Sequence, residues 1–81
     1  MSYFTYILKS QSHDTFYYGS TKDLQKRLAE HNKGRVRYTK GRIPWAIHYF
    51  EEFDSRSEAV RREIYFKSIE GYNFLKKMKI I

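Results

Sequence analysis

The sequence predicts an α+β domain in which a small sheet is covered by helices, with elements in the order β-β-α-β-α-α. Two aromatic segments separated by a polar turn indicate a hairpin in the first twenty residues. A third aromatic segment follows the only proline, and helix-capping residues precede two further segments. Because a hairpin alone is unstable, we expect the third strand and the helices to complete a single domain over residues 1–81.

The predicted hairpin joins residues 3–9 to residues 15–19, both rich in aromatic or β-branched side chains. The segment between them is polar and turn-like. We expect Tyr6 to lie opposite Tyr17, which leaves a loop of residues 10–13. The two tyrosines would then be cross-strand neighbours on one face of the sheet.

A helix is predicted directly after the hairpin. Thr21 is a suitable N-cap, and Asp23 would lie in the first turn, where negative charge is favoured. Leu24 and Leu28 supply an apolar line, and Gly34 is a natural stop.

A basic segment separates this helix from the third strand. Residues 33–42 contain five Lys or Arg residues and predict a loop or a short helical turn. Pro44 precedes the third strand, which is apolar and aromatic and spans residues 45–53.

Two helices are predicted after the third strand. Ser55 and Glu58 form a capping box that begins a long helix, which extends to about Glu70. Gly71 is expected to break this helix, and a short basic helix follows over residues 74–81.

The charge of the chain favours a polyanionic partner. It carries 16 Lys and Arg residues against 9 Asp and Glu, a formal net charge of +7, and neutralising a nucleic acid releases counterions. An acidic membrane surface or an acidic protein would also suit this charge. The absence of cysteine excludes disulfides and thiolate metal ligands. The first apolar run is too short for a membrane span, so we expect a soluble, cytoplasmic protein with no membrane insertion.

The strand residues Tyr6, Tyr17 and Gly19 are the first candidates for a functional site. Two phenol oxygens side by side would hold a water molecule or a phosphate oxygen, although tyrosines also commonly pack as cross-strand aromatics. Gly19 ends its strand, where it allows close approach of a backbone or a ligand, or simply a bend.

Arg27 and His31 are four residues apart on the first predicted helix and are therefore neighbours beside its apolar line. An arginine there would bind phosphate through its planar guanidinium, and the histidine would act as a base or a phosphate donor. The alternative is a solvated helix flank with an incidental contact.

Glu63 is the most informative residue, because it falls within the predicted apolar face of the long helix. On a helical wheel this face contains Ala59, Val60, Ile64, Phe66 and Ile69. A carboxylate there is costly unless it is paired or binds a metal. Both interpretations stay open, and an ion pair would use Lys67 or Arg56.

The order and spacing of these residues resemble the GIY-YIG nuclease superfamily, and in particular its small stand-alone bacterial members of the excinuclease-like or endonuclease-like kind. The similarity extends from Tyr3 to about Lys77. The matching positions are Tyr6, Tyr17-Tyr18-Gly19, Asp23-Leu24, Arg27-Leu28, His31-Asn32, Pro44-Trp45, Ala59 and Arg62-Glu63. The first motif departs from the family pattern as Phe4-Thr5-Tyr6, and the second has an aromatic residue at its middle position.

The resemblance implies a three-stranded antiparallel sheet flanked by helices and a catalytic set of Tyr6, Tyr17, Arg27, His31 and Glu63. Tyr6, assisted by Tyr17 or His31, would activate water, and Arg27 would hold the scissile phosphate. Glu63 would bind one Mg²⁺ or Mn²⁺ ion that keeps several waters. Because the pKa of free tyrosine is near ~10, base chemistry needs a cation that lowers it, and we expect Arg27 to do so.

The function implied by the resemblance is metal-dependent hydrolysis of DNA phosphodiester bonds, in repair or recombination. The expected DNA-binding residues are Gly19, Lys33, Arg35, Arg37, Tyr38, Lys40, Arg42 and Lys67. Many members of the superfamily carry an asparagine after the last helix, and Asn73 lies near that position. The alternatives are a non-catalytic nucleic-acid-binding module and an accessory component of a repair complex, whose protein partner would supply substrate choice.

Overall fold

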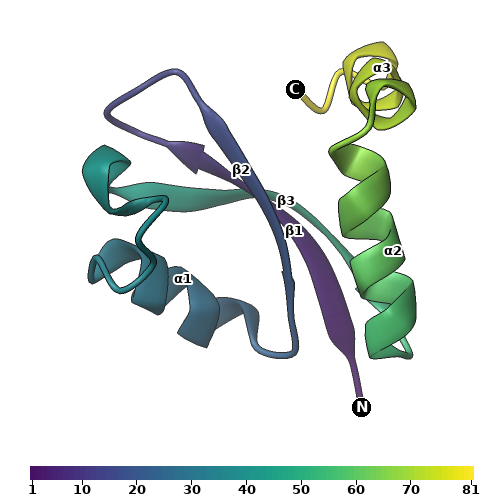
Figure 1. The fold of residues 1–81 in the computed structure, drawn as a ribbon, viewed down its shortest axis with the longest axis horizontal. Coiled ribbons are helices and arrows are strands. Elements are labelled where there is room, and N and C mark those ends of the chain that lie inside the picture. Colours follow the sequence, from purple (N-terminus) through teal and green to yellow (C-terminus); the bar gives the residue numbers. More distant parts are fainter.

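The helices lie on both sides of a central sheet in the computed structural model, which describes residues 1–81 (Figure 1). Helix α1 covers one face and helices α2 and α3 cover the other (Figure 1). In chain order the elements are β1 (Tyr3–Ser10), β2 (Phe16–Thr21), α1 (Leu24–Asn32), a 3₁₀ turn (Lys40–Arg42), β3 (Trp45–Phe53), α2 (Arg56–Phe66) and α3 (Ile69–Lys77). The sheet is antiparallel with strand order β2-β1-β3, so the predicted fold class is confirmed. None of the helices is long and apolar enough to cross a membrane.

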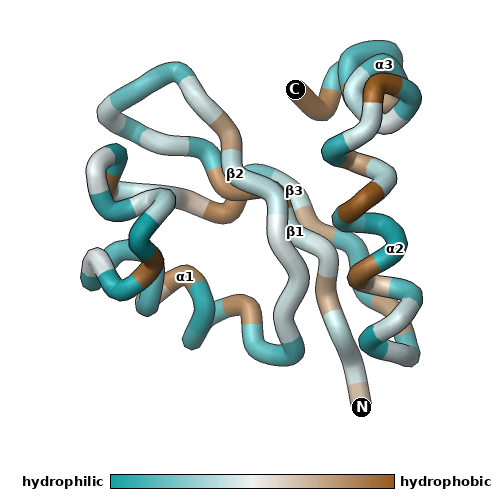
Figure 2. Tube along the Cα trace, in the orientation of Figure 1, coloured by the Kyte–Doolittle hydropathy of each residue, from teal (hydrophilic) through white to brown (hydrophobic).

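Most of the central strand β1 is buried, because it has a neighbour on each edge and helices on each face. Tyr6 and Leu8 point toward α1 and pack with Trp45, while Ile7 points the other way and packs with Phe66 and Leu75. This alternation is the period of two expected of a strand covered on both faces. Figure 2 shows hydrophobic positions spaced singly along α1 and α2, as expected of helices that bury one side.

The register of the hairpin differs from the predicted one by two residues. Tyr6 lies opposite Gly19, and Tyr17 lies opposite Leu8. The longer loop is favoured by Ser10, whose hydroxyl accepts hydrogen bonds from the backbone N–H groups of Ser12 and His13. A shift of two residues keeps each side chain on its predicted face, so Tyr6 and Tyr17 still share one face as diagonal neighbours.

Helix α1 begins two residues later than predicted. Asp23 is the N-cap, and its carboxylate accepts a hydrogen bond from the backbone N–H of Lys26 at 3.1 Å. Thr21 instead ends β2, and its hydroxyl accepts from the N–H of Asp23 at 3.2 Å. The helix ends at Asn32, and Gly34 follows with a φ of 75°, as expected of a residue that stops a helix.

The predicted break at Gly71 is wrong. The long helix ends at Phe66, and Ser68 caps a new helix by accepting from the N–H of Gly71 at 3.1 Å. Gly71 therefore lies inside α3, where a Cβ atom would be 1.8 Å from the carbonyl oxygen of Tyr65. The glycine is needed because α3 crosses the end of α2 at close range, and not because it ends a helix.

The earlier break also corrects the predicted apolar face of α2. Ala59 and Phe66 are buried as expected, but the exposed fractions of Ile64 and Ile69 are 62% and 78%. Ile69 is the first residue of α3, so it does not belong to the helical wheel of α2.

Candidate active site

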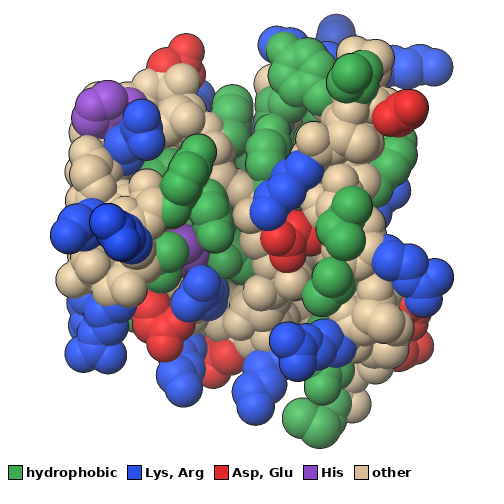
Figure 3. Space-filling view, in the orientation of Figure 1, with side chains coloured by type: hydrophobic (Ala, Val, Ile, Leu, Met, Phe, Trp, Pro, Cys, Tyr) green, Lys and Arg blue, Asp and Glu red, His purple; other side chains and the backbone are tan.

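The candidate site lies along the edge strand β2, where side chains from the two faces of the sheet meet. Tyr6, Tyr17, Arg27 and His31 approach from the α1 side, and Glu63 approaches from α2 on the other side. Figure 3 shows a hollow between these two halves, with hydrophobic side chains along its floor and charged side chains on both walls. The two sides meet because the neighbouring β2 residues Gly19 and Ser20 contact Tyr6 and Glu63, respectively.

Gly19 makes room for the Tyr6 side chain. A Cβ atom at this position would lie 2.4 Å from the Tyr6 hydroxyl oxygen, so any larger residue would displace the phenol. Gly19 is itself buried. This contact accounts for the glycine without a DNA contact, although it is the same glycine that the resemblance placed next to DNA.

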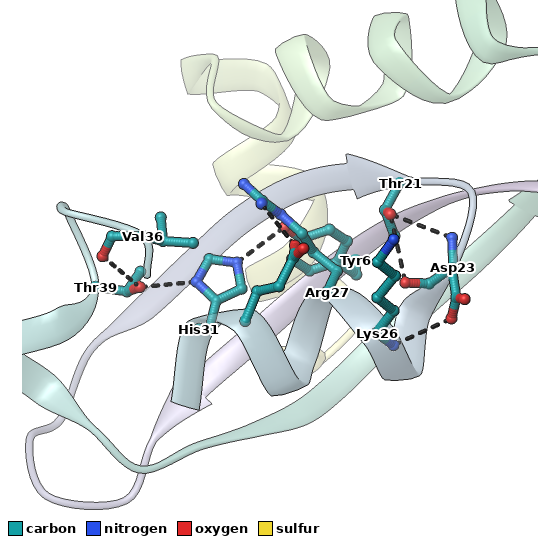
Figure 4. Close-up of polar contacts among 9 residues, drawn as sticks. Tyr6, Thr21, Asp23, Lys26, Arg27, His31, Val36 and Thr39 are labelled. Atoms are coloured by element: carbon teal, nitrogen blue, oxygen red, sulfur yellow. Dashed lines mark hydrogen bonds and ion pairs between the residues drawn. The ribbon is translucent and has the colours of Figure 1, made fainter. Parts of the chain in front are cut away.

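A chain of buried hydrogen bonds holds the Tyr6 hydroxyl in place (Figure 4). The Tyr6 hydroxyl lies 3.1 Å from His31 Nε2, and His31 Nδ1 lies 2.7 Å from the Thr39 hydroxyl. The Thr39 hydroxyl donates its one proton to the Val36 carbonyl at 3.3 Å. Thr39 must then accept from His31 Nδ1–H, which leaves Nε2 free to accept from the Tyr6 O–H.

Burial raises the pKa of Tyr6 to about 12, despite the opposing effect of Arg27 beside it. Arg27 does lower the pKa of Tyr6, as expected. The loss of solvation of the phenolate raises this pKa by more, so the net shift is upward. Tyr6 is a neutral phenol at pH ~7, well below this pKa.

His31 is fully buried, and burial followed by the charge of Arg27 lowers its pKa from 6.5 to about 4. The imidazole is consequently neutral near pH ~7 and has an unprotonated nitrogen to accept a proton. Its ring also lies against Tyr17, with centroids 5.0 Å apart. The interpretation of His31 as part of a solvated helix flank is excluded by this burial.

Arg27 lies one helical turn before His31, next to the Tyr6 hydroxyl (Figure 4). Its guanidinium pairs with Glu30 at 3.1 Å, and 35% of its side chain is exposed. An ion pair at this exposure is weak. A phosphate oxygen could replace Glu30 as the partner, because a guanidinium forms strong charge-assisted bonds with phosphate.

Glu63 lies in the second half of α2, where it faces Ser20 and Lys67. Its two carboxylate oxygens accept from the Ser20 hydroxyl and from the Lys67 ammonium, both at 2.8 Å. The ion pair left open by the sequence therefore forms with Lys67 and not with Arg56. Half of the Lys67 side chain is exposed and 21% of the Glu63 side chain is, so the lysine can leave while the carboxylate stays.

Glu63 could serve as the single protein ligand of a metal ion. No group of three or more His, Cys, Asp or Glu side chains converges here or elsewhere in the structure. A hard ion such as Mg²⁺ commonly keeps several waters and uses one or two carboxylates plus substrate phosphate. Glu63 would hold such an ion only after Lys67 moves from its second oxygen.

The predicted DNA-binding residues separate into two groups. Tyr38 and Lys67 line a cavity beside Tyr17 at the hollow. The remaining basic positions lie exposed on the segment between α1 and β3 and line none of the cavities next to the site: Lys33, Arg35, Arg37, Lys40 and Arg42. Asn73 is exposed on α3.

The sequence alone did not identify several polar residues of the site. Thr39 is fully buried and orients His31, and Ser20 orients Glu63. Lys22, Lys26 and Arg56 line two cavities at the other end of β2 from Tyr38. Of these residues, only Lys22 and Lys26 could have been found from the sequence. They flank Asp23, the N-cap of the helix that carries Arg27.

The comparison with known families agrees with this arrangement. Residues 2–75 match the model of the GIY-YIG catalytic domain. The chain belongs to the GIY-YIG family. Membership implies nuclease-type activity on a nucleic acid, which the arrangement of Tyr6, Arg27 and Glu63 suits.

This GIY-YIG protein is similar to several small UPF0213 proteins. One from Halobacterium salinarum is 49% identical over 72% of this chain and 77% of its own length. One from Listeria innocua is 44% identical over 88% of this chain and 79% of its own length. The solution NMR structure of a UPF0213 protein from Bacillus halodurans has a TM-score of 0.56 at 32% identity, covering 98% of this chain and 86% of the other.

Proposed function

We propose that this GIY-YIG protein is a divalent-metal-dependent endonuclease that hydrolyses DNA phosphodiester bonds in the hollow along β2. The proposal rests on one observation: two different sets of reactive side chains lie on either side of the edge strand β2. A hydroxyl and a neutral base, Tyr6 and His31, lie on one side with the cation Arg27, and the carboxylate of Glu63 lies on the other.

Tyr6 and His31 are suited to move a proton from the attacking water. The phenol passes its proton to His31 Nε2 as its oxygen takes one from water, so Tyr6 need not be ionised in the resting protein. The pKa of Tyr6 near 12 and of His31 near 4 make this transfer unfavourable without substrate. We expect Tyr17, which packs on both rings, to position the pair.

Arg27 and Glu63 would neutralise charge that develops on the phosphate. Arg27 would exchange Glu30 for a nonbridging oxygen, and Glu63 would hold Mg²⁺ or Mn²⁺ once Lys67 had moved aside. When bound, the metal would stabilise negative charge on the leaving oxygen. Lys67 would then be free to contact a neighbouring phosphate, as the predicted DNA-binding role requires.

DNA is proposed as the substrate because the chain has a net charge of +7 and basic residues flank the hollow at both ends. The exposed cations at Lys33, Arg35, Arg37 and Lys40 would hold the backbone beyond the site and set orientation more than sequence. We further propose a role in repair or recombination, with a protein partner that supplies specificity.

The test is cleavage of labelled single-stranded, duplex, flap and branched DNA with Mg²⁺ or Mn²⁺. Glu63→Gln should lower the cleavage rate at least about 100-fold, because the metal that stabilises negative charge on the leaving oxygen in the transition state would lose its protein ligand. Glu70→Gln makes the same chemical change at an exposed position of α3 and should keep wild-type cleavage. Wild-type protein that cuts none of these DNAs, or an unimpaired Glu63→Gln variant, would refute the proposal.

The Glu63–Lys67 ion pair favours a second candidate, a nucleic-acid-binding module that does not cleave. In that case Lys67 stays on the carboxylate, and Glu63→Gln leaves both binding and melting temperature almost unchanged. Steeply salt-dependent DNA binding without cleavage in either metal would support this candidate. Cleavage that appears only with an added protein would instead indicate an accessory component of a larger complex.

A further inference from the structure

A cavity of about 490 Å³ lies beside the candidate site and is lined mainly by aromatic rings. Its lining residues are Phe16, Tyr17, Tyr18, Tyr38 and Lys67. The volume is in the range of pockets that hold small ligands, roughly 300–1,000 Å³. Three of these residues, Phe16, Tyr18 and Tyr38, have no part in the proposed hydrolysis.

Tyr38 is the exposed wall of the cavity. Its exposed fraction is 72%, which is high for a large aromatic side chain, and its ring centroid lies 5.7 Å from that of Tyr17. The ring covers no buried cluster of the core. The aromatic side chain therefore contributes little to folding at this position and is available to a ligand.

Tyr17 is the rigid inner wall. Its ring packs against Tyr6, His31 and Trp45 with centroid distances of 6.5, 5.0 and 6.4 Å. A flat ligand that enters beside Tyr38 would therefore meet a ring that is already held in place. Such a pre-formed surface loses little entropy on binding.

The charge at the cavity rim suits a ligand that carries phosphate. Lys67 contributes to the wall, and its ammonium reaches Glu63 of the candidate site. Tyr17 and Lys67 thus belong both to the cavity and to the surroundings of the hydrolytic residues. A nucleotide whose base lies in the cavity would have its phosphate near this cation and close to the hollow.

We propose that this cavity binds an unpaired nucleobase by stacking on Tyr38 and Tyr17. The position of the base beside the scissile phosphate rests on the proposed nuclease function, while the stacking itself does not. A base inside a duplex has both faces covered by its neighbours, so only an unstacked base offers a face to these rings. The preferred substrate is accordingly DNA with a single-stranded nucleotide next to the cleaved bond.

The test measures DNA binding in EDTA, so that no cleavage is required. Fluorescein-labelled oligonucleotides of one sequence are compared as single strands and as full duplexes with wild-type and Tyr38→Ala protein. We expect Tyr38→Ala to weaken single-strand binding roughly 5- to 150-fold, the usual effect of one lost base–aromatic stack, and to change duplex binding by less than about twofold.

Two matched variants separate stacking from other effects. Tyr38→Phe keeps the ring and should restore single-strand affinity. Phe50→Ala removes an exposed aromatic ring from β3, the edge strand opposite β2, and should bind both DNAs as wild type does. A thermal melt of each variant confirms that it is folded.

Equal losses on the two DNAs, no loss in Tyr38→Ala, or wild-type protein that does not bind single strands would overturn the stacking proposal. These outcomes are independent of the cleavage assay. Selective loss of single-strand binding in a protein that never cleaves would refute the nuclease and retain the base site. Metal-dependent cleavage by a protein in which Tyr38→Ala causes no selective loss of single-strand binding would support the nuclease and refute the base site.

Discussion

Two tyrosines on opposite faces of the sheet, Tyr6 and Tyr49, both have a pKa raised to about 12, but for different reasons. Burial is the main cause at Tyr6, whose hydroxyl faces the neutral His31. At Tyr49 the main cause is the hydrogen bond that its hydroxyl donates to the Glu51 carboxylate. The same shift therefore arises from lost solvation in one case and from a bound anion in the other.

The network around Tyr49 is closed, because each charge has a partner. Arg62 donates to both oxygens of Glu51, at 2.7 and 3.2 Å, and its guanidinium lies about 5 Å from the ring centres of Tyr65, Phe66 and Phe74. Partial burial acts to raise the pKa of Glu51, but the bonds from Arg62 and Tyr49 lower it overall. Such a network stabilises the α2–α3 face and leaves no group free for a substrate.

The network around Tyr6 opens onto the hollow along β2. It contains a neutral imidazole, and its cation, Arg27, has only a weak ionic partner in Glu30. A perturbed pKa therefore does not by itself mark a catalytic residue. What distinguishes the two sites is whether a charged group can exchange its partner for a ligand.

The largest expected effect is that of Arg27→Ala on cleavage. We expect the cleavage rate to fall about 100- to 1,000-fold, because the phosphate loses a preorganised charge partner. The free energy of unfolding should change by less than about 1 kcal/mol, since a partly exposed ion pair with Glu30 and a contact with the neutral Tyr6 hydroxyl are lost. Cleavage assays and urea unfolding measure the two quantities, and a variant that is active or largely unfolded would contradict the assignment.

Arg62→Ala should produce the opposite result. Glu51 loses its cation and three rings lose a cation–π contact, so we expect a loss of about 2–3 kcal/mol in the free energy of unfolding. Cleavage by the folded fraction should stay near the wild-type rate. Arg61→Ala, at an exposed position of α2, is the matched control for urea unfolding. Unchanged stability of Arg62→Ala would show that the network is not structural.

The last expected effect is a pH dependence of stability that comes from His31. Its pKa is 6.5 in the unfolded chain and about 4 when folded, so between these values the unfolded chain binds more protons. The contribution to stability is complete above pH ~6.5 and is lost as the pH falls toward ~4. Arg27 and Glu30 on α1, with Tyr6 and Tyr17 on the sheet, are the charged or titratable groups around it.

Urea unfolding near pH ~4.5 and pH ~7 tests this dependence. His31→Gln should narrow the difference between the two free energies of unfolding. His13→Gln, at an exposed loop position, should keep the wild-type difference. An equal difference in wild type and His31→Gln would mean that other groups account for the acid sensitivity.

The class and order of the elements followed from local patterns in the sequence. Aromatic segments, a proline before the third strand and the Ser55–Glu58 capping box each act over a few residues, and the structure has strands and helices at these places. The errors were at junctions. The hairpin register was set by the Ser10 hydroxyl in the loop, and Ser68 ended the long helix before Gly71 could.

The sequence by itself determined which side chains could do chemistry: two tyrosines, an arginine and a histidine one helical turn apart, and a carboxylate in a mixed helix. Only the tertiary structure decided how these side chains are protonated and paired. Whether Glu63 meets Lys67, whether His31 is neutral and whether Arg27 or burial controls Tyr6 depend on contacts between residues far apart in the chain. Solvation and pairing are set by what surrounds a group in space, and no spacing along the chain encodes that surrounding.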